Sequence, residues 1–285
     1  SDSIEQIKDV TSTTIDINYF NTSNVTSMVS MFKDTSFNKP IDDLDTSKVT
    51  SMNSMFFGAT TFDQEIGSWD VSAVVDMYGM FYEANAFNGD ISGWNTHQVT
   101  SMSSMFNNAY TFDQEIGSWD VSAVVDMYGM FYEANAFNGD ISGWNTHQVT
   151  SMSSMFNNAY TFEGNLSNWD VSKVETMESM FFNVTNFNSD ISGWHTKSVT
   201  TMDSMFSGAT AFDQPIGKWD VTAVTNMNAM FSGASAFNQS LYNWDITFED
   251  TIGFNPTKSG LDLKDMLDGT SALKYYILNG DVSND

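Results

Sequence analysis

The sequence predicts an α/β solenoid of about ten coils, each coil being one repeat of 25 residues. Three observations lead to this fold class. A phenylalanine opens a new copy every 25 residues, all eight tryptophans fall at one position of the repeat, and eighteen of the nineteen methionines fall at two. A fixed period of this length is typical of solenoids, because one short supersecondary unit can bury its apolar face only against copies of itself.

The repeats divide the chain into a long solenoid and two terminal pieces. Residues 13–248 hold the repeats, with degenerate copies starting at 13 and 237. Residues 1–12 are expected to form an N-terminal cap, and residues 249–285 a C-terminal cap or tail. The full copies start at 37, 62, 87, 112, 137, 162, 187 and 212.

The first part of each copy predicts a short parallel strand. The segment from Phe62 to Trp69 is too short and too rich in turn-forming residues for a helix, so the strand is expected near Ile66. Stacked copies would pair these strands at a spacing of about 4.8 Å.

The second part of each copy predicts a short helix. Apolar residues follow one another at spacings of 3, 3, 1 and 3, which places them on one stripe of a helix of two or three turns. Ser72 lies just before the stripe and is a candidate N-cap. In this copy the stripe consists of Val74, Met77, Met80, Phe81 and Ala84.

The residues that recur in every copy are expected to fill the interior of the coils. They are the Phe, Ile, Trp, Val, Met and Ala of the repeat. For the tryptophans an alternative stays open, because a column of exposed indoles would form a platform for sugars.

Composition excludes several classes of function. The 36 acidic residues against ten basic ones, all lysine, give a net charge of −26, which disfavours nucleic acids and anionic membranes as partners. The absence of cysteine excludes disulfides and thiolate metal sites. No apolar stretch approaches the roughly 20 residues that span a bilayer, so no membrane insertion is expected. Because the chain begins with Ser1, it is expected to be a piece of a longer protein.

The string from Val99 to Trp119 resembles the 25-residue units of BspA-type leucine-rich-repeat surface proteins. It reads V-T-S-M-S-S-M-F-N-N-A-Y-T-F-D-Q-E-I-G-S-W, and the likeness extends over residues 13–248. The resemblance implies a leucine-rich-repeat solenoid on the bacterial cell surface, with adhesion to host or neighbouring cells.

A second resemblance lies in the tail. The segment from Asp250 to Gly269, which includes D-L-K-D-M-L-D-G, is similar to a segment near the C-terminal end of large RTX adhesins. This implies that the solenoid is the ligand-binding region of such an adhesin, outside the cell and in calcium. The chain lacks the glycine-rich calcium repeats of that family.

Two polar columns alternate between acid and amide. The position after the opening Phe reads Asn38, Asp63, Asn88 and Asp113, and the position after Trp begins with Asp70 and Asn95. This alternation, with its true period of two copies, avoids stacking bare charges at every step. The side chains are expected to bond the backbone of turns.

One acidic column does not alternate in this way, and it supplies the first candidate site. Successive carboxylates about 5 Å apart repel one another unless solvent or cations intervene. The column is therefore either a solvated acidic face or a stripe that binds calcium or a cationic ligand. Its members are Glu65, Asp90, Glu115 and Asp140, and after Asn165 also Asp190. No other cofactor is expected.

Aromatic residues outside the core pattern supply the second candidate site. They occupy positions where neighbouring copies carry Ser, Asn or Asp, so packing does not require them. Exposed tyrosines beside polar residues suit recognition of protein or glycan, although they would equally cover the junctions between coils. The candidates are Tyr78, Tyr82, Tyr128, Tyr132 and Phe182, with Phe57, Tyr110 and Tyr160 in similar positions.

No catalytic arrangement emerges from the sequence. His97 and His147 are one residue duplicated, His195 also lies in a turn column, and the acids repeat evenly along the chain, whereas an active site breaks symmetry. Residues 61–111 recur letter for letter as 111–161, which indicates duplication and tolerance of length change.

These observations predict a non-enzymatic adhesion domain of a secreted or cell-surface bacterial protein. Its partner would be a protein or glycan on another cell, and self-association stays open. A passive spacer is the alternative. A solenoid that binds an ordered solid such as ice is a minor alternative, because the column of Thr50, Thr100, Thr150 and Thr200 mostly skips every other coil.

Overall fold

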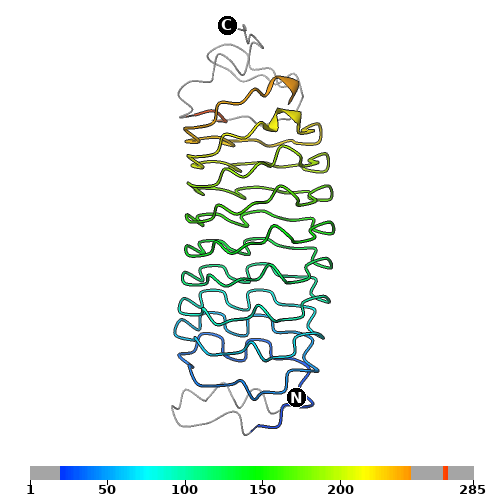
Figure 1. Ribbon diagram of the computed structural model, residues 1–285, viewed down its shortest axis with the longest axis vertical. Helices are drawn as coiled ribbons and strands as arrows, with labels where there is room; N and C mark the ends of the chain where they lie inside the picture. The colour runs from blue at the N-terminus through cyan, green and yellow to red at the C-terminus, as the bar shows by residue number, and fades with distance from the viewer. Residues whose placement is uncertain (1–19, 245–265, 269–285) are drawn as a thin grey trace.

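The protein is a stack of equivalent coils, as the repeats predict. The computed structural model describes residues 20–244 and 266–268. The coils lie one above another along the long axis of the molecule (Figure 1). Eight parallel bridges connect them, from the Ser27–Ser51 bridge to the Thr201–Asn226 bridge, and beyond the first each spans 25 residues. The predicted N-terminal cap and most of the predicted tail lie outside the described residues.

The predicted helix is wrong. Within residues 20–244 and 266–268 the regular helices are two short 3-10 helices, η3 (Ile216–Lys218) and η4 (Tyr242–Trp244). The segment from Val74 to Ala84 is instead a bridge followed by successive turns. Ser72 is no helix cap, and its backbone N–H donates to the Asp70 carboxylate at 3.0 Å.

Two left-handed residues in each coil prevent the helix. The turn from Met52 to Met55 has Ser54 as its third residue, with φ of 54°, and the turn that closes at Ala59 has Gly58 there, with φ of 67°. Positive φ at the third residue is typical of type II turns and incompatible with an α-helix. Each turn brings the chain back to the same orientation after three residues. The apolar side chains therefore still point into the core at the spacing expected for a helix.

The same segment joins neighbouring coils through its backbone. The backbone N–H groups alternate between two kinds of partner. One N–H closes a turn within its own coil, and the next donates to a carbonyl of the following coil. Met52 donates to Asp76 at 3.0 Å and Phe56 to Met80 at 2.9 Å, and Phe57 closes a turn within its coil on Ser54 at 3.2 Å. Every N–H in this run therefore has a partner, as buried backbone requires.

The parallel pairing also lies elsewhere than predicted. No bridge forms at Ile66 or its equivalents in the described coils, where the chain is extended or turning. Side chains connect the coils on this segment instead. The backbone N–H of Asp63 donates to the Asn38 side chain at 3.0 Å, and the Thr96 hydroxyl donates to the Asp120 carbonyl at 2.9 Å.

The tryptophans belong to the core, which confirms their predicted burial. Trp119 is 3% exposed, and the other seven are equally hidden. Each indole N–H donates to the carbonyl of the central Ile or Leu one coil earlier, as Trp119 does to Ile91 at 3.0 Å. The same bond recurs for all eight, at 3.0 to 3.2 Å. A platform of exposed indoles is thereby ruled out.

Phenylalanine rings stack in two continuous columns inside the rod. Along one column, Phe81 lies 5.6 Å from Phe106 with nearly parallel rings, and within a coil Phe106 lies 3.8 Å from Phe112. Stacked aromatic pairs contribute about 0.5–1.5 kcal/mol beyond the area they bury. The predicted Met, Val, Ile and Ala columns are buried beside them.

The described part of the tail continues the stack. The Phe231 N–H donates to the Met266 carbonyl at 2.9 Å and the Gly233 N–H to the Asp268 carbonyl at 2.8 Å, as each coil does to the next. Met266 and Leu267 are buried in the common core. Residues 266–268 therefore take the place of a further coil at this position, and the capping role of the tail stays a prediction.

Replacing one tryptophan should test its indole bond. In Trp119→Phe the Ile91 carbonyl loses its donor while buried, so the free energy of unfolding should fall by about 1–3 kcal/mol. Urea unfolding followed by circular dichroism measures this change. Tyr128→Phe, which removes a hydroxyl from an exposed ring, is the control and should leave the midpoint unchanged. Equal midpoints for Trp119→Phe and the native chain would contradict the anchoring role.

Candidate functional site

Exposed aromatic and aliphatic side chains gather on the backbone-paired segment of four successive coils. Tyr78 is 43% exposed and Tyr128 is 48% exposed, although large apolar side chains of this chain are otherwise mostly buried. Val75 and Val125 stand beside them in a column otherwise held by Thr or Glu. We name this surface the tyrosine face. It consists of Val75, Tyr78, Tyr82, Glu83, Tyr110, Val125, Tyr128, Tyr132, Glu133 and Tyr160.

The tyrosine face is corrugated with a period of two coils. Between the coils of Tyr78 and Tyr128 lies a coil with Ser103 at the same position, and Ser103 is only 3% exposed. Asn107, between Tyr82 and Tyr132, is likewise buried. In these two columns large rings therefore form ridges on alternate coils, with small polar residues between them. Tyr110 and Tyr160 stand on the intervening coils, in another column.

The aromatic candidates divide into two groups. Tyr78, Tyr128, Tyr110 and Tyr160 are exposed, whereas Tyr82, Tyr132, Phe57 and Phe182 are half-buried. The Tyr82 ring stacks on Phe57 of the preceding coil, with centroids 4.3 Å apart and an interplanar angle of 2°. Packing at coil junctions thus accounts for part of the second group. Binding by either group stays a prediction.

Carboxylates lie among these rings. The Tyr110 hydroxyl donates to Asn108 at 3.1 Å and to the Glu133 carboxylate at 3.5 Å. Burial and then the charge of Glu83 raise the pKa of Tyr82, and burial and then Glu133 raise that of Tyr110. The hydroxyls therefore stay protonated and polar, beside a negative charge that is open to a partner.

Two of these carboxylates occupy strained backbone positions. Glu83 has φ of 55° and Glu133 has φ of 54°. Asn, Asp and Gly tolerate this left-handed conformation best, and they hold the same position in the other described coils, as Asn108 and Gly58 do. Strain of this kind concentrates at functional sites, so we add Glu83 and Glu133 to the candidate binding residues.

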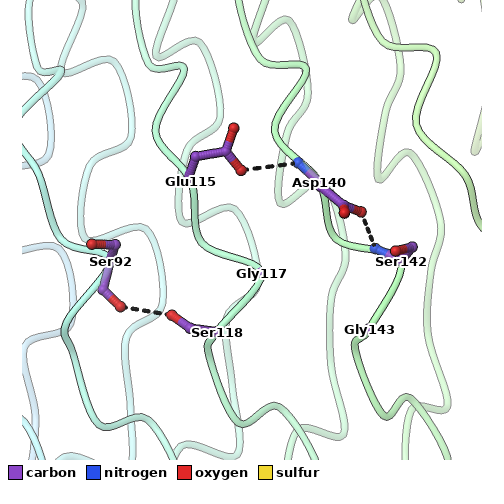
Figure 2. Close-up of a pocket in the computed structure, with 7 residues that line it drawn as sticks. All are labelled: Ser92, Glu115, Gly117, Ser118, Asp140, Ser142 and Gly143. Atoms are coloured by element: carbon purple, nitrogen blue, oxygen red, sulfur yellow. Dashed lines mark hydrogen bonds between the residues drawn. The ribbon is translucent and has the colours of Figure 1, made fainter.

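The acidic column lies on a different segment of each coil, and Glu115 and Asp140 of this column line a shallow groove across three successive coils (Figure 2). Gly117 and Gly143, which have no side chains, leave room there. A Cβ at Gly143 would meet nothing within 4 Å, whereas one at Gly117 would meet the Asp140 carbonyl oxygen. We name this depression the acidic groove. Its lining is Ser92, Glu115, Gly117, Ser118, Asp140, Ser142 and Gly143.

The carboxylates of this column are held by separate local contacts. The Asp140 carboxylate accepts the Ser142 N–H at 2.9 Å, and Asp90 and Asp190 each accept the N–H two residues on. Hydrogen bonds from the hydroxyl and N–H of Ser142 hold the pKa of Asp140 below its usual range. The Glu115 carboxylate accepts the Asp140 N–H at 3.4 Å.

Calcium binding by Glu65, Asp90, Glu115 and Asp140 stays a prediction. In the coils and the tail segment that the structure describes, no three acidic or histidine side chains come together as metal ligands. These four residues stand in successive coils, each within its own repeat.

The alternating columns are structural, as expected. Asn38, Asp63 and Asn88 each accept the backbone N–H of the corresponding residue one coil later, at 2.9 to 3.0 Å. The bond goes to the next coil rather than to the residue's own turn, so these side chains hold the coils in register.

The remaining candidate columns are occupied by local bonds. His97 and His147 lie in exposed turns, where each ring is bonded to an Asn side chain two residues earlier. The Thr100 hydroxyl donates to the carbonyl of Val75 at 3.3 Å, and Val75 and Val125 interrupt its column. Within residues 20–244 this column therefore forms no flat threonine array for an ordered solid.

These coils and surfaces define a repeat protein whose polar and aromatic columns lie on a continuous core. The chain belongs to the family described as "Mycoplasma protein of unknown function, DUF285", whose model matches residues 2–112, 89–191 and 161–252. No curated protein matches the chain. Among the described residues, no helix has the length and apolar character needed to cross a membrane.

Several solved structures are similar to this chain at low identity. One is TLR13 in a complex with ssRNA13, at 10% identity and a TM-score of 0.28, covering 70% of this chain and 36% of that one. A leucine-rich-repeat protein of Leptospira interrogans has 4% identity and a TM-score of 0.30, covering 68% and 60%. A leucine-rich cell surface protein of Faecalibacterium prausnitzii has 11% identity and a TM-score of 0.28, covering 69% and 72%. The chain thus spans less than two thirds of the first two.

Sequence reasoning missed four residues of the tyrosine face. Val75 and Val125 replace Thr, and Glu83 and Glu133 replace Asn or Gly, on the coils that carry Tyr78 and Tyr128. Comparing each column at a period of two coils would have found them. The difference between the two glycines of the acidic groove cannot be predicted from the sequence. Both are glycine, and only the structure shows that their surroundings differ.

The two glycines of the groove should respond differently to the same substitution. Gly117→Ala drives a methyl group against the Asp140 carbonyl and should lower the free energy of unfolding by about 1–3 kcal/mol. Gly143→Ala enters open space and should be neutral or stabilising by up to about 1 kcal/mol. Denaturant unfolding of both variants measures the difference. Similar losses in the two variants would show that the groove is packed differently.

Acid should weaken the turns that follow the tryptophans. Hydrogen bonds from the Ser72 hydroxyl and N–H lower the pKa of Asp70 from 3.8, and Asp120 and Asp170 are lowered by equivalent bonds. A lowered folded pKa stabilises the protein above the unfolded value, and this contribution is lost as the pH falls through the folded value.

The test compares the native chain with the triple variant Asp70→Asn, Asp120→Asn, Asp170→Asn. Asn95 and Asn145 hold this column in other coils, so the variant keeps the turns and removes the titration. Denaturant midpoints at about pH 7 and about pH 3 should show the larger loss for the native chain. A loss of the same size in both proteins would exclude these aspartates as the cause.

Proposed function

We propose that this chain is a non-enzymatic adhesion domain of a secreted or cell-surface bacterial protein, and that the tyrosine face is its binding surface. The observation that carries the proposal is the recurrence of exposed Tyr78 and Tyr128, at 43% and 48% exposure, on coils whose core is complete without them. Exposed tyrosines supply large, rigid and amphipathic contact area, and they are enriched at recognition surfaces. The expected partner is a protein or glycan of another cell.

Repetition supports a binding role further. The face is present twice, on identical residues two coils apart, because residues 61–111 recur as 111–161. Two equal contacts on one rigid support bind a repeated partner more tightly than either contact alone. The resemblance of the tail to RTX adhesins agrees with a place in a larger surface protein.

The experiment uses substitutions that the chain itself offers. Ser103 and Ser153 stand in the column of Tyr78, and Thr60 and Thr185 in that of Tyr110. The variant therefore carries Tyr78→Ser, Tyr128→Ser, Tyr110→Thr and Tyr160→Thr. Its adherence to panels of cells and to glycan and protein arrays is compared with that of the native chain, with calcium and with chelator.

Loss of adherence by at least about tenfold, with circular dichroism unchanged, is the expected result. The matched control is Glu65→Asn with Glu115→Asn, which places in the acidic column the residue found at Asn165. If the tyrosine variant still adheres and the control does not, the binding site lies on the acidic column instead of the tyrosine face. A native chain that binds no cell and no array would favour the spacer instead.

A further inference from the structure

The four coils that carry the tyrosine face alternate in the size of their surface side chains. Residues 61–111 recur as 111–161, so each column of these coils is one pair of residues repeated. In one column Tyr78 and Tyr128 are 43% and 48% exposed, whereas Ser103 is 3% exposed. Three further columns alternate in the same way. They are Val75, Thr100, Val125 and Thr150; Tyr82, Asn107, Tyr132 and Asn157; and Asn85, Tyr110, Asn135 and Tyr160.

Charges on this face alternate as well. Carboxylates alternate with amides in one column and with hydroxyls in another, so no two carboxylates of a column lie on adjacent coils. The first column is Glu83, Asn108, Glu133 and Asn158, and the second is Asp76, Ser101, Asp126 and Ser151. None of these eight side chains is buried. The acidic column differs, because Glu65, Asp90, Glu115 and Asp140 place a carboxylate on each of the four coils.

This alternation makes the face complementary to itself when two copies lie antiparallel. A two-fold axis that crosses the rod within the contact plane keeps each column opposite the same column of the second copy and reverses the order of the coils. With the axis at the middle of the four coils, the first coil faces the fourth and the second faces the third. Tyr78 then faces Ser153 of the second copy, and Ser103 faces Tyr128. A large ring therefore meets a small side chain at every coil.

The same arrangement sets no carboxylate of these two columns against another. Glu83 faces Asn158 of the second copy and Asn108 faces Glu133, so each carboxylate meets an amide that can donate a hydrogen bond. Pairing through the acidic column would instead set Glu65 against Asp140, and like charges across an interface oppose association. Charge thus favours the tyrosine face over the acidic column as the surface of contact between copies.

We infer that the tyrosine face pairs with the same face of a second copy of this chain, in the antiparallel direction. The inference deepens the proposed function and rests on it, because the protein of another cell that this face binds is then a copy of the chain itself. Rods that project from two opposing cells meet in opposite directions, as this arrangement requires. An exposed apolar surface on a chain whose large apolar side chains are mostly buried is typical of an interface.

The net charge sets the conditions under which the pair forms. Each copy carries a net charge of −26, so long-range repulsion opposes the approach of two copies at low salt. Salt screens this repulsion, with a screening length of about 8 Å at physiological ionic strength. Association of two copies should therefore strengthen as salt is raised, whereas binding of a cationic partner should weaken.

Sedimentation equilibrium of the full chain tests the association directly. Measurements at protein concentrations up to about 1 mM cover weak dimers. The native chain should form dimers, and their dissociation constant at about 0.5 M sodium chloride should be at least about threefold lower than at about 0.05 M.

Two variants of complementary shape test the contact. Tyr78→Ser with Tyr128→Ser makes all four positions of the column small, and Ser103→Tyr with Ser153→Tyr makes all four large. Each variant alone should dimerise at least about tenfold more weakly than the native chain, with circular dichroism unchanged. An equimolar mixture of the two should form heterodimers, because every large side chain of one then meets a small side chain of the other.

A charge variant gives a second test if the added rings unfold the chain. Asn108→Glu with Asn158→Glu sets carboxylates against Glu83 and Glu133 of the second copy and should weaken the dimer by at least about tenfold. Glu83 and Glu133 already occupy this left-handed position, so the backbone accepts the change. The matched control, Asn95→Asp with Asn145→Asp, adds two negative charges on another segment and should change the dissociation constant by less than about twofold.

A native chain that stays monomeric at every salt concentration would overturn the inference, as would a dimer that weakens as salt is raised. Equal losses in the charge variant and its control, or a mixture of shape variants that stays monomeric, would also reject it. If the inference fails and the variant that lacks the four exposed tyrosines still loses adherence to cells, the adhesive function stands with a partner of other chemistry. If that variant adheres normally, the function itself is rejected.

Discussion

The rod depends on coil-to-coil register, and two kinds of hydrogen bond maintain it on two segments of each coil. On one segment, alternate backbone N–H groups donate to the next coil, as Phe56 does to Met80 at 2.9 Å. On the other, where the backbone is unpaired with its neighbours, the indole of Trp119 donates to Ile91 at 3.0 Å. Because each bond recurs between the same two positions of the repeat in coil after coil, a given position faces the same neighbouring positions in every coil. The continuous columns of the core and those of the surface both follow from this register.

The core could be predicted from the sequence, but the local conformation could not. An apolar residue that recurs at one position of every repeat predicts burial there, and Trp119, Met105 and Phe106 are buried as this pattern predicts. A run of type II turns points a side chain into the core every three residues, much as a helix does. The spacing of Met77, Met80 and Phe81 therefore does not distinguish a helix from a run of turns. The distinguishing signal is the column of Gly, Asn and Ser at the left-handed positions. Ser is a weak marker of the left-handed conformation, so the sequence alone does not identify these positions.

The candidate surfaces were located in part for a related reason. The alternation of acid and amide along a column is visible in the sequence. The column of Asn38 and Asp63 makes the predicted hydrogen bonds to the backbone. How far a ring projects depends on its neighbours in space. Tyr78 projects while Tyr82 packs on Phe57, although four residues separate the two on one chain. Residue type alone does not carry that difference.

The two-coil period also constrains how such genes can change length. Adding or deleting one coil would set Asp63 next to another carboxylate in the register column and would place two tyrosine ridges side by side. Unequal crossing-over that exchanges fifty residues leaves both alternations intact, as the identity of 61–111 with 111–161 shows. Alleles of different length should therefore differ by pairs of coils. The length of the rod and the number of tyrosine-bearing contact sites would then change together, by one pair of coils at a time.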